Sequence, residues 1–222
     1  MKRKVICFPE KEEVILIQEE LSEELDEDEI LVETLKSLIS PGTELALYSG
    51  THVGFKDPDN LWAKYPHYPG YISIGKIIKS GKGAGDLQPG DIVLNSSNHC
   101  SHAKLKATDP LVIKLPDSVD LDSALFARMA AISVTAPLLA DFFLGDKVAV
   151  IGLGIVGNLC SQLFQLSGAE VFGIETNSKR IEIAHNAGIN RVIKGGETSR
   201  VKEEILKETE GLGLDVVVEA TG

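Results

Sequence analysis

The chain has 222 residues, enough for one large domain or two small ones. Its composition, with 43% hydrophobic and 25% charged residues, is typical of a soluble globular protein. The formal net charge of -11 argues against a nucleic-acid partner and against an anionic membrane, because both require a basic surface. No apolar run approaches the roughly 20 residues of a membrane span, and the basic N-terminus lacks the apolar core of a secretory signal. The three cysteines (Cys7, Cys100 and Cys160) are scattered, which suits a reducing cytoplasm and provides no disulfide framework.

The first half of the chain, to about residue 115, contains short runs rich in valine and isoleucine, separated by glycine and proline turns. The predicted strands are Val5–Phe8, Val14–Gln18, Ile30–Ile39, Ile72–Lys79, Asp91–Leu94, Ala103–Lys106 and Leu111–Leu115. Many short strands at close spacing indicate a compact β-barrel. The acidic segment Glu19–Glu29 is expected to be a solvated loop between two strands. Ser40–Leu61 lacks periodicity and is expected to be a loop with a short helical turn.

The sequence around Pro116 marks a boundary, after which the pattern becomes helical. Asp120 or Asp122 can cap a helix that continues through Met129 and beyond. Pro137 is expected to start or bend a further helix that ends near Gly145. These signals predict two domains, residues 1–118 and 119–222.

The segment Lys147–Glu175 contains the strongest motif in the sequence. An apolar strand, Val148–Ile151, leads directly into the glycine-rich run GLGIVG at residues 152–157. A helical pattern follows, with Leu159, Leu163 and Leu166 on one face, and a second strand, Val171–Ile174, ends on Glu175. In a dinucleotide site the three glycines provide a tight turn, close approach of the backbone to the pyrophosphate, and close helix–strand packing. Because strand, glycines, helix, second strand and acid occur in order, the segment predicts a dinucleotide-binding βαβ unit.

Further strands and helices continue this alternation. Ser178–Ala187 and Ser199–Glu210 are predicted helices, and Arg191–Lys194 and Leu214–Val218 are predicted strands. A complete dinucleotide-binding sheet has the strand order 3-2-1-4-5-6, and the chain supplies strands 1 to 4. The expectation is therefore a partial Rossmann sheet from a longer enzyme, and a fragment that is itself inactive.

Motifs along nearly the whole chain resemble those of the medium-chain dehydrogenase/reductase superfamily, the zinc-type alcohol dehydrogenase relatives. The matching stretches are Ser40–Glu44 with Ser49-Gly50, Pro69–Tyr71 with Gly75, Pro89–Asp91, Leu115–Asp117, Gly145-Asp146 with Val148, the glycine motif, and Glu219–Gly222. The resemblance implies an α/β fold, with an N-terminal GroES-like β-barrel domain before the Rossmann domain. Within the superfamily, SLISPGTELALYSG together with PGYISIG looks most like the bacteriochlorophyllide dehydrogenase-like subgroup.

The metal-binding motifs of the zinc enzymes are absent from the matching positions. Pro41 replaces the first cysteine ligand, and Tyr71 stands where those enzymes have a histidine. The third ligand is expected near Leu125–Ala131, which contains no Cys, Asp, Glu or His. Cys100 is alone in the segment where four cysteines would hold a structural zinc. The resemblance therefore implies a zinc-free branch.

Without a metal, a hydroxyl or an imidazole must polarise or protonate the substrate oxygen. Thr43 matches the proton-relay hydroxyl of the family, although it can instead bond its own turn. Tyr71 is a possible proton donor or a packed aromatic residue. Glu44 matches an acid behind the metal site that can also pair with an arginine, and His52 lies in a loop expected to face substrate. The other histidines (His67, His99, His102 and His185) are expected to be surface or structural residues.

The resemblance implies a cofactor site formed by the glycine motif and by the acid that follows it. Its predicted residues are Gly152, Leu153, Gly154, Ile155, Val156, Gly157, Glu175, Arg180 and Thr221. Glu175 lies about 20 residues after the motif, where an acid bonds the adenosine ribose and repels a 2′-phosphate. NAD(H) is therefore expected over NADP(H), although Lys179 or Arg180 can instead neutralise a phosphate.

Two classes of function remain open at this point. The first is a zinc-independent, NAD(H)-dependent oxidoreductase acting on an alcohol or carbonyl group of a small-molecule substrate, with reduction of a quinone or activated alkene as its alternative. The second is a non-catalytic nucleotide-binding module. A cytoplasmic location and a homo-oligomeric full-length protein are also expected.

Overall fold

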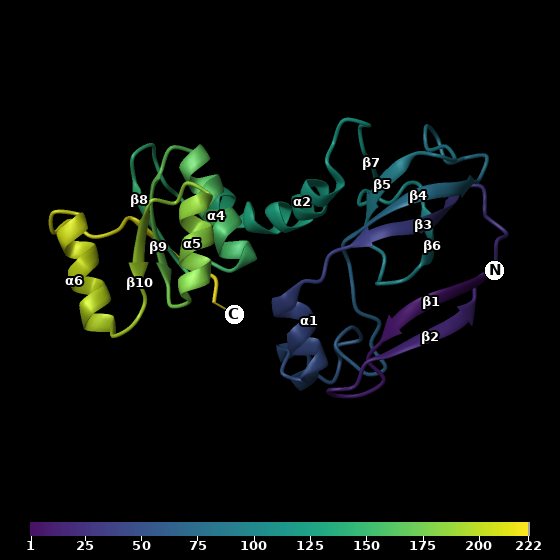
Figure 1. Cartoon of the computed structure of the whole chain (residues 1–222), viewed down its shortest axis with the longest axis horizontal. Helices are drawn as coiled ribbons and strands as arrows, with labels where there is room; N and C mark the ends of the chain where they lie inside the picture. Colours follow the sequence, from purple (N-terminus) through teal and green to yellow (C-terminus); the bar gives the residue numbers. More distant parts are fainter. Residues whose placement is uncertain (222) are drawn as a thin grey trace. The chain divides into compact units, whose positions relative to one another are not determined.

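The computed structural model describes residues 1–221, and Gly222, the last residue of the closing motif, lies outside them. The chain divides into two compact units, Met1–Phe126 and Ala127–Gly222 (Figure 1). The boundary expected after residue 118 lies within the first of these units.

The first unit is built from antiparallel β-structure, with a strand at each of the seven predicted places. Strands β1 (Lys2–Cys7) and β2 (Ile15–Glu20) form a two-stranded sheet. The five-stranded sheet has the order β6-β3-β4-β5-β7, in which the strands are β3 (Glu29–Ser37), β4 (Ser73–Ser80), β5 (Ile92–Asn95), β6 (His102–Lys106) and β7 (Ile113–Lys114). The strands of the predicted barrel thus form two separate hydrogen-bonded sheets. An isolated β-bridge links Val5 of β1 to Cys100, just before β6.

The core of the five-stranded sheet follows from the alternation of its sequence. Ile30, Val32, Ile77 and Val93 come from three adjacent strands and are at most 1% exposed. Side chains two residues apart point to the same face of a strand, so these residues form one continuous apolar layer.

The segment Ser40–Leu61 is more helical than the sequence suggests. It contains helix α1 (Pro41–Tyr48) and the short 3-10 helix η1 (Val53–Lys56). Proline is well suited to the first turn of a helix because its fixed φ is helical and no intrahelical N–H is lost there, so Pro41 starts α1 rather than interrupting it. The expectation of a loop with one helical turn was therefore wrong for residues 41–48.

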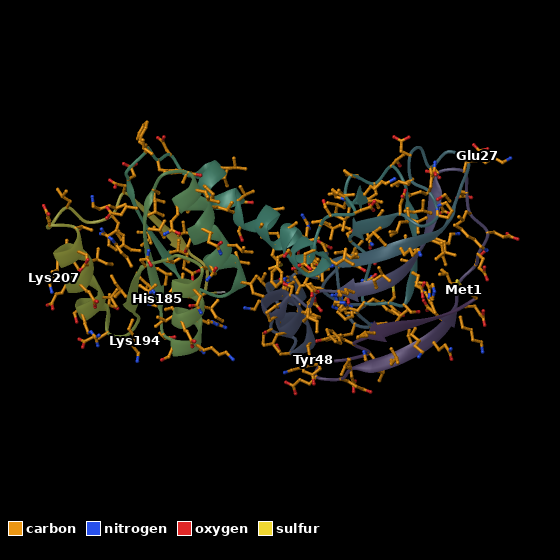
Figure 2. The ribbon with its side chains drawn as sticks, turned by 45° about the horizontal axis from the view of Figure 1, so that its top comes forward. Met1, Glu27, Tyr48, His185, Lys194 and Lys207 are labelled. Atoms are coloured by element: carbon orange, nitrogen blue, oxygen red, sulfur yellow. The ribbon has the colours of Figure 1, made fainter. Side chains whose placement is uncertain are left out.

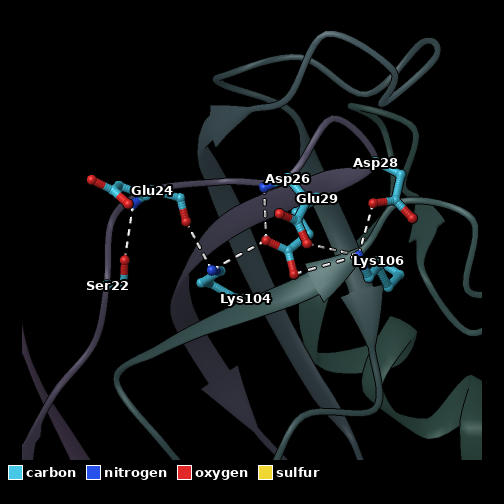
Figure 3. Close-up of polar contacts among 7 residues, drawn as sticks. All are labelled: Ser22, Glu24, Asp26, Asp28, Glu29, Lys104 and Lys106. Atoms are coloured by element: carbon cyan, nitrogen blue, oxygen red, sulfur yellow. Dashed lines mark hydrogen bonds and ion pairs between the residues drawn. The ribbon is translucent and has the colours of Figure 1, made fainter.

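The acidic segment between β2 and β3 is exposed and neutralised by lysines of the neighbouring strands. Lys106 of β6 pairs with Asp28 at 2.8 Å, and Lys104 pairs with Glu29 at 3.1 Å (Figure 3). Lys79 of β4 pairs with Glu23 at 2.6 Å. Exposed pairs of this kind contribute up to about 1 kcal/mol each. The segment is therefore an acidic loop, as predicted.

Two helices precede the parallel sheet. The carboxylate of Asp120 accepts hydrogen bonds from the backbone and hydroxyl of Ser123, which identifies Asp120 as the cap of helix α2 (Leu121–Ser133). Helix α3 (Thr135–Leu139) contains Pro137 and ends well before Gly145, where the sequence placed its end. Ala140, which follows the C-terminal end of α3, has an extended backbone conformation. The chain then runs as a loop to the first parallel strand.

The helical stretch Leu121–Leu139 is 19 residues long and has the length and composition of a membrane span. This corrects the expectation that no apolar run approaches that length. Asp122 and Arg128 are its only two charged residues, so composition alone does not separate it from a span. Core helices of soluble proteins meet the same criterion, and the finding by itself is weak evidence for a membrane location.

The second unit contains a parallel sheet with the order β10-β9-β8-β11. Its strands are β8 (Lys147–Ile151), β9 (Glu170–Glu175), β10 (Arg191–Lys194) and β11 (Val216–Glu219). This is the order 3-2-1-4 of a dinucleotide-binding sheet. Helices α4 (Ile155–Leu166) and α5 (Ser178–Asn186) cover one face of the sheet, and α6 (Thr198–Glu208) covers the other (Figure 1).

The packing of α4 differs from the sequence prediction. The face of α4 that packs on the sheet is formed by Gly157, Cys160, Ser161 and Phe164, while Leu166 is 84% exposed. The prediction that Leu159, Leu163 and Leu166 form the apolar face of this helix was therefore wrong. Gly157 must pack closely on the strand–helix turn, and that requirement sets the rotation of the helix.

Candidate active site

The glycine-rich turn between β8 and α4 has the geometry of a phosphate-binding loop. Gly152 has φ of +86°, a conformation that residues with a side chain rarely adopt. A Cβ on Gly157 would lie 1.8 Å from the carbonyl oxygen of Gly152, so the third glycine is required for close packing. A Cβ on Gly154 would meet no protein atom within 4 Å. The space beside Gly154 is therefore open, and a bound group can approach the backbone there.

The N-terminus of α4 provides donors for that group. Gly154 caps this helix, and no side chain accepts a hydrogen bond from its first turn. The first N–H groups of a helix lack intrahelical partners and lie at the positive end of the helix dipole. An anionic phosphate fits this position, so the residues present suit the pyrophosphate of a dinucleotide.

Glu175, the last residue of β9, stabilises the glycine turn through hydrogen bonds to its backbone. One carboxylate oxygen accepts the N–H of Leu153 at 2.8 Å, and the other accepts the N–H groups of Thr176 and Asn177 at 2.8 and 2.9 Å. The residue is 5% exposed. Burial alone raises the pKa of Glu175, but these backbone donors and the guanidinium of Arg180 hold it below its usual value. Glu175 is therefore a buried carboxylate that favours its ionised form.

The two other predicted cofactor residues also lie near the turn. Arg180 on α5 is exposed, and its guanidinium is 3.7 Å from the Glu175 carboxylate. The methyl group of Thr221 is 2.9 Å from the position that a Cβ on Gly152 would take. All the residues predicted for the cofactor are thus gathered within the second unit, around the carboxyl ends of β8 and β9.

In the first unit, Glu44 belongs to a buried chain of hydrogen bonds. One of its carboxylate oxygens is 2.8 Å from Nε2 of His99, and the other accepts the N–H of Ser40 at 2.8 Å. Nδ1 of His99 is 2.8 Å from the hydroxyl of Ser37. Glu44 is 5% exposed and His99 is 6% exposed, whereas Ser37 at the end of β3 is exposed. The chain Ser37–His99–Glu44 therefore leads from the surface to a buried carboxylate.

Glu44 and His99 also line an open groove of about 350 Å³ within the first unit. The rest of its wall is almost entirely apolar and includes Ile6, Phe8, Val14, Ile39 and Leu45. Tyr48 lies at the wall too, but its hydroxyl donates to the carbonyl of Glu12. The surface of the groove is thus apolar, and the carboxylate–imidazole pair lies almost completely buried behind it.

The other predicted catalytic residues do not join Glu44. Thr43 is half-buried on α1, and Tyr71 is half-buried just before β4. His52 caps η1, where its Nδ1 accepts the N–H of Gly54, and its ring lies 5.1 Å from that of Trp62. Within residues 1–221, no hydrogen bond connects Thr43, Tyr71 or His52 to Glu44.

The histidines differ in their surroundings. His99 is buried and pairs with Glu44, so the expectation that His99 lies at the surface was wrong. Glu44 pairs with this imidazole instead of with an arginine. His67 is buried, and burial holds its pKa below the usual value. His185 is exposed on α5 (Figure 2). The sequence held no signal for the His99 pairing, because 55 residues separate its two members.

Among the described residues, no group of three or more His, Cys, Asp or Glu side chains has an arrangement that could hold a metal ion. The segment Leu125–Ala131, where the family resemblance places a third zinc ligand, lies on α2 and contains Arg128. The Nε atom of Arg128 is buried and has no hydrogen-bond partner in the part of the chain that the structure describes.

Comparison with known proteins supports the family resemblance. Residues 156–222 match the family model of zinc-binding dehydrogenases. The chain is 27% identical over 249 residues to L-threonine 3-dehydrogenase from Caldanaerobacter subterraneus subsp. tengcongensis, covering 96% of this chain and 67% of that protein. Across four of the curated relatives, the chain spans 63% to 69% of their length.

Solved structures show the same fold. 2R,3R-butanediol dehydrogenase from Bacillus subtilis matches with a TM-score of 0.79 at 21% identity, over 99% of this chain and 71% of that one. A protein from Sinorhizobium meliloti 1021, described as a zinc-binding dehydrogenase and solved with NADP, matches with a TM-score of 0.79 at 17% identity, over 100% and 70% of the two chains. The two-unit α/β fold is therefore that of medium-chain dehydrogenases, with a GroES-like and a Rossmann domain. Residues 156–222 are thus similar to zinc-binding dehydrogenases, the chain is similar in sequence to zinc-type alcohol dehydrogenase-like proteins, and it shares the fold of medium-chain dehydrogenases.

Proposed function

We propose that the protein is an NAD(H)-dependent oxidoreductase that interconverts an alcohol and a carbonyl compound. The observation that supports this proposal most directly is the open space beside Gly154, next to the uncapped start of α4. A tight turn alone does not require that opening, whereas a pyrophosphate does. When bound, the nicotinamide cofactor supplies the hydride. The glycine turn holds its phosphates, and Glu175 holds the turn.

The preference for NAD(H) over NADP(H) rests on the charge of Glu175. A carboxylate that favours its ionised form repels the 2′-phosphate of NADP(H), and burial weakens the screening of that repulsion. The exposed cations Lys179 and Arg180 favour the opposite choice, and one neighbouring structure contains NADP. The carboxylate is expected to determine the cofactor preference, because it is buried and fixed by backbone donors, whereas both cations are exposed.

Zinc independence is the second part of the proposal, and it is supported by the ligand positions. Pro41 and Tyr71 offer neither a thiolate nor an imidazole, and the segment Leu125–Ala131 offers an arginine. Zinc at a catalytic site needs about three protein ligands. These features fit the zinc-free branch and the bacteriochlorophyllide dehydrogenase-like subgroup.

We expect the purified protein to contain less than about 0.1 zinc per chain when it is prepared without chelators or added metal, because the ligand set is missing. Elemental analysis by mass spectrometry measures this. Cadmium exchange followed by optical spectroscopy is a second measurement, since cadmium–thiolate coordination absorbs in the ultraviolet. A stoichiometric zinc with sulfur or nitrogen ligands would show that the chain belongs with the zinc enzymes.

The proposed reaction is tested by titrating the protein with NADH and NADPH and then assaying a panel of carbonyls, quinones and activated alkenes. The expected result is tighter binding of NADH than of NADPH and, with the full-length protein, NADH oxidation in the presence of carbonyls. Turnover only with quinones or alkenes would favour the alternative reductase. Binding without turnover on any class would favour a nucleotide-binding module.

A further inference from the structure

The structure assigns an acid-sensitive latch to His52 and His67, two histidines that hold the flap Val53–Lys64 against the rest of the first unit. Among residues 1–221, every hydrogen bond of this flap stays within it or goes to one of these two histidines. The latch requires neither a substrate nor a cofactor, because it consists of two ring nitrogens and their protons.

Both latch residues are themselves anchored outside the flap. The N–H of His52 donates to the carbonyl of Ala46 on α1 at 3.1 Å. The backbone of His67 exchanges two hydrogen bonds of 2.8 Å with that of Phe8, just after β1. The two rings therefore connect a fixed part of the first unit to a segment that has no other polar contact with it.

At the start of the flap, the ring of His52 is a hydrogen-bond acceptor. Its Nδ1 accepts the N–H of Gly54 at 3.0 Å and so caps η1. An imidazole nitrogen accepts only while it is unprotonated, so this bond requires the neutral ring with its proton on Nε2. Protonation of His52 places a hydrogen on Nδ1, and the cap is lost.

At the end of the flap, the ring of His67 is a donor. Its Nδ1 lies 3.2 Å from the carbonyl oxygen of Trp62. A carbonyl oxygen only accepts, so Nδ1 carries the proton and Nε2 is the basic nitrogen. His67 is 7% exposed, and within residues 1–221 its Nε2 has no hydrogen-bond partner. Protonation of this nitrogen therefore creates a buried charge without a partner, which is unfavourable.

The groups that face His67 oppose its protonation on balance. The rings of Phe8 and Trp62, whose centroids lie 6.3 and 5.5 Å from that of His67, are uncharged. Burial is the main cause of the lowered pKa of His67, and the charge of a protonated His52 lowers it further. The Glu44 carboxylate on α1 and the bond to Trp62 raise it, but Glu44 is already paired with His99. The charged side chains of the flap itself are exposed: Lys56, Asp57, Asp59 and Lys64.

Acid is therefore expected to release the flap. The stability that His67 contributes is fully present above its unfolded pKa of about 6.5, and it is lost as the pH falls through the lowered folded pKa. Loss of the His52 cap acts in the same direction. Phe55 and Ala63 of the flap pack on an apolar cluster that contains Phe8 and Leu47, so release exposes this cluster to solvent.

Hydrogen exchange of the flap amides, measured by mass spectrometry and corrected for the intrinsic effect of pH, tests the latch. Between about pH 7.5 and pH 5.5, exchange in Val53–Lys64 of the parent protein is expected to become at least about tenfold faster, while exchange in β3 and β4 stays the same. Trp62 is the one tryptophan of the chain, and its ring lies 5.1 Å from that of His52 and 5.5 Å from that of His67. Its fluorescence should therefore change over the same pH range.

Asparagine variants keep the two hydrogen bonds but cannot titrate. The side-chain oxygen of His52→Asn can accept the N–H of Gly54, and the side-chain nitrogen of His67→Asn can donate to Trp62. In the double variant, the flap exchange is expected to change less than about twofold between the two pH values, and each single variant should be intermediate. His185→Asn is the control, because His185 is exposed on α5 of the second unit, and it should respond to pH as the parent does.

Equal flap exchange at both pH values in the parent protein would overturn the latch, and so would a full pH response in a folded double variant. Melting temperatures at pH 7.5 show which variants are folded. If the double variant does not fold, NMR of the 15N-histidine-labelled parent decides. At pH 7.5 His52 is expected to carry its proton on Nε2 and His67 on Nδ1. The opposite tautomer in either ring would reject the latch.

Discussion

Gly157→Ala is expected to destabilise the second unit severely, whereas Gly154→Ala should leave the fold almost unchanged and weaken dinucleotide binding. The two substitutions add the same methyl group to the same turn. At Gly157 the methyl carbon would lie 1.8 Å from the Gly152 carbonyl oxygen, and at Gly154 it would contact no protein atom within 4 Å. The comparison therefore separates packing from ligand access.

The magnitudes differ enough to be measured. Alanine is favoured over glycine inside a helix by about 1 kcal/mol, which would stabilise a Gly157→Ala variant if the space were available. Forcing a methyl group against backbone costs roughly 3 kcal/mol or more, so the clash prevails. Gly154 has φ of -63°, which alanine adopts readily, and the loss of glycine at a helix cap costs about 1 kcal/mol or less.

Thermal unfolding and calorimetric titration with NADH test this comparison. Gly157→Ala should lower the melting temperature by several degrees, while Gly154→Ala should raise the Kd for NADH at least about tenfold, which is ~1.4 kcal/mol, because its methyl group occupies the place of the pyrophosphate. An unchanged NADH affinity in a folded Gly154→Ala protein would mean that no phosphate approaches the turn.

The parallel sheet was predictable because its signals are local. The apolar run of β8, the glycine turn and the acid at the end of β9 are contiguous in sequence, and their spacing reflects the geometry of one βαβ unit. The rotation of α4 was not predictable from its leucines, since it depends on how closely Gly157 packs against Gly152. That distance is a property of the folded turn and not of helical periodicity.

The site in the first unit was likewise predictable from the sequence only where its signal was local. Glu44 was found from the motif that contains it, but its partner His99 lies 55 residues away in the sequence. A lone histidine in a loop gives no periodic or spacing signal. Pairing between distant polar residues therefore required the structure, and so did the open groove beside them.

Glu175 is expected to make the stability of the second unit depend on acid pH. Its pKa in the folded protein is held below the usual value, about 4.3 in an unstructured chain, by the backbone donors at Leu153, Thr176 and Asn177. The ionised form is therefore favoured by folding. The stability it contributes is fully present above the unfolded pKa and is lost as pH falls through the folded pKa. The parent protein should thus lose stability progressively below about pH 4.

Glu175→Gln removes the charge but keeps the shape, and it is expected to reduce stability at pH 7 by about 1 to 3 kcal/mol. The amide offers one acceptor oxygen, and its NH₂ group faces backbone N–H donors that the second carboxylate oxygen had accepted. The variant should also lose the part of the acid-dependent change that Glu175 contributes, and bind NADPH more tightly relative to NADH, since the charge that repels the 2′-phosphate is gone.

Glu182→Gln on α5 is the matched control, because Glu182 is exposed and outside the glycine turn. Urea unfolding from about pH 2.5 to 7 and the Kd values for NADH and NADPH are measured for the parent and both variants. The control should follow the parent in stability and in cofactor preference. If Glu175→Gln also follows the parent in stability, the carboxylate does not hold the turn. If the parent itself prefers NADPH, its charge does not select the cofactor, and the exposed cations Lys179 and Arg180 become the groups that do.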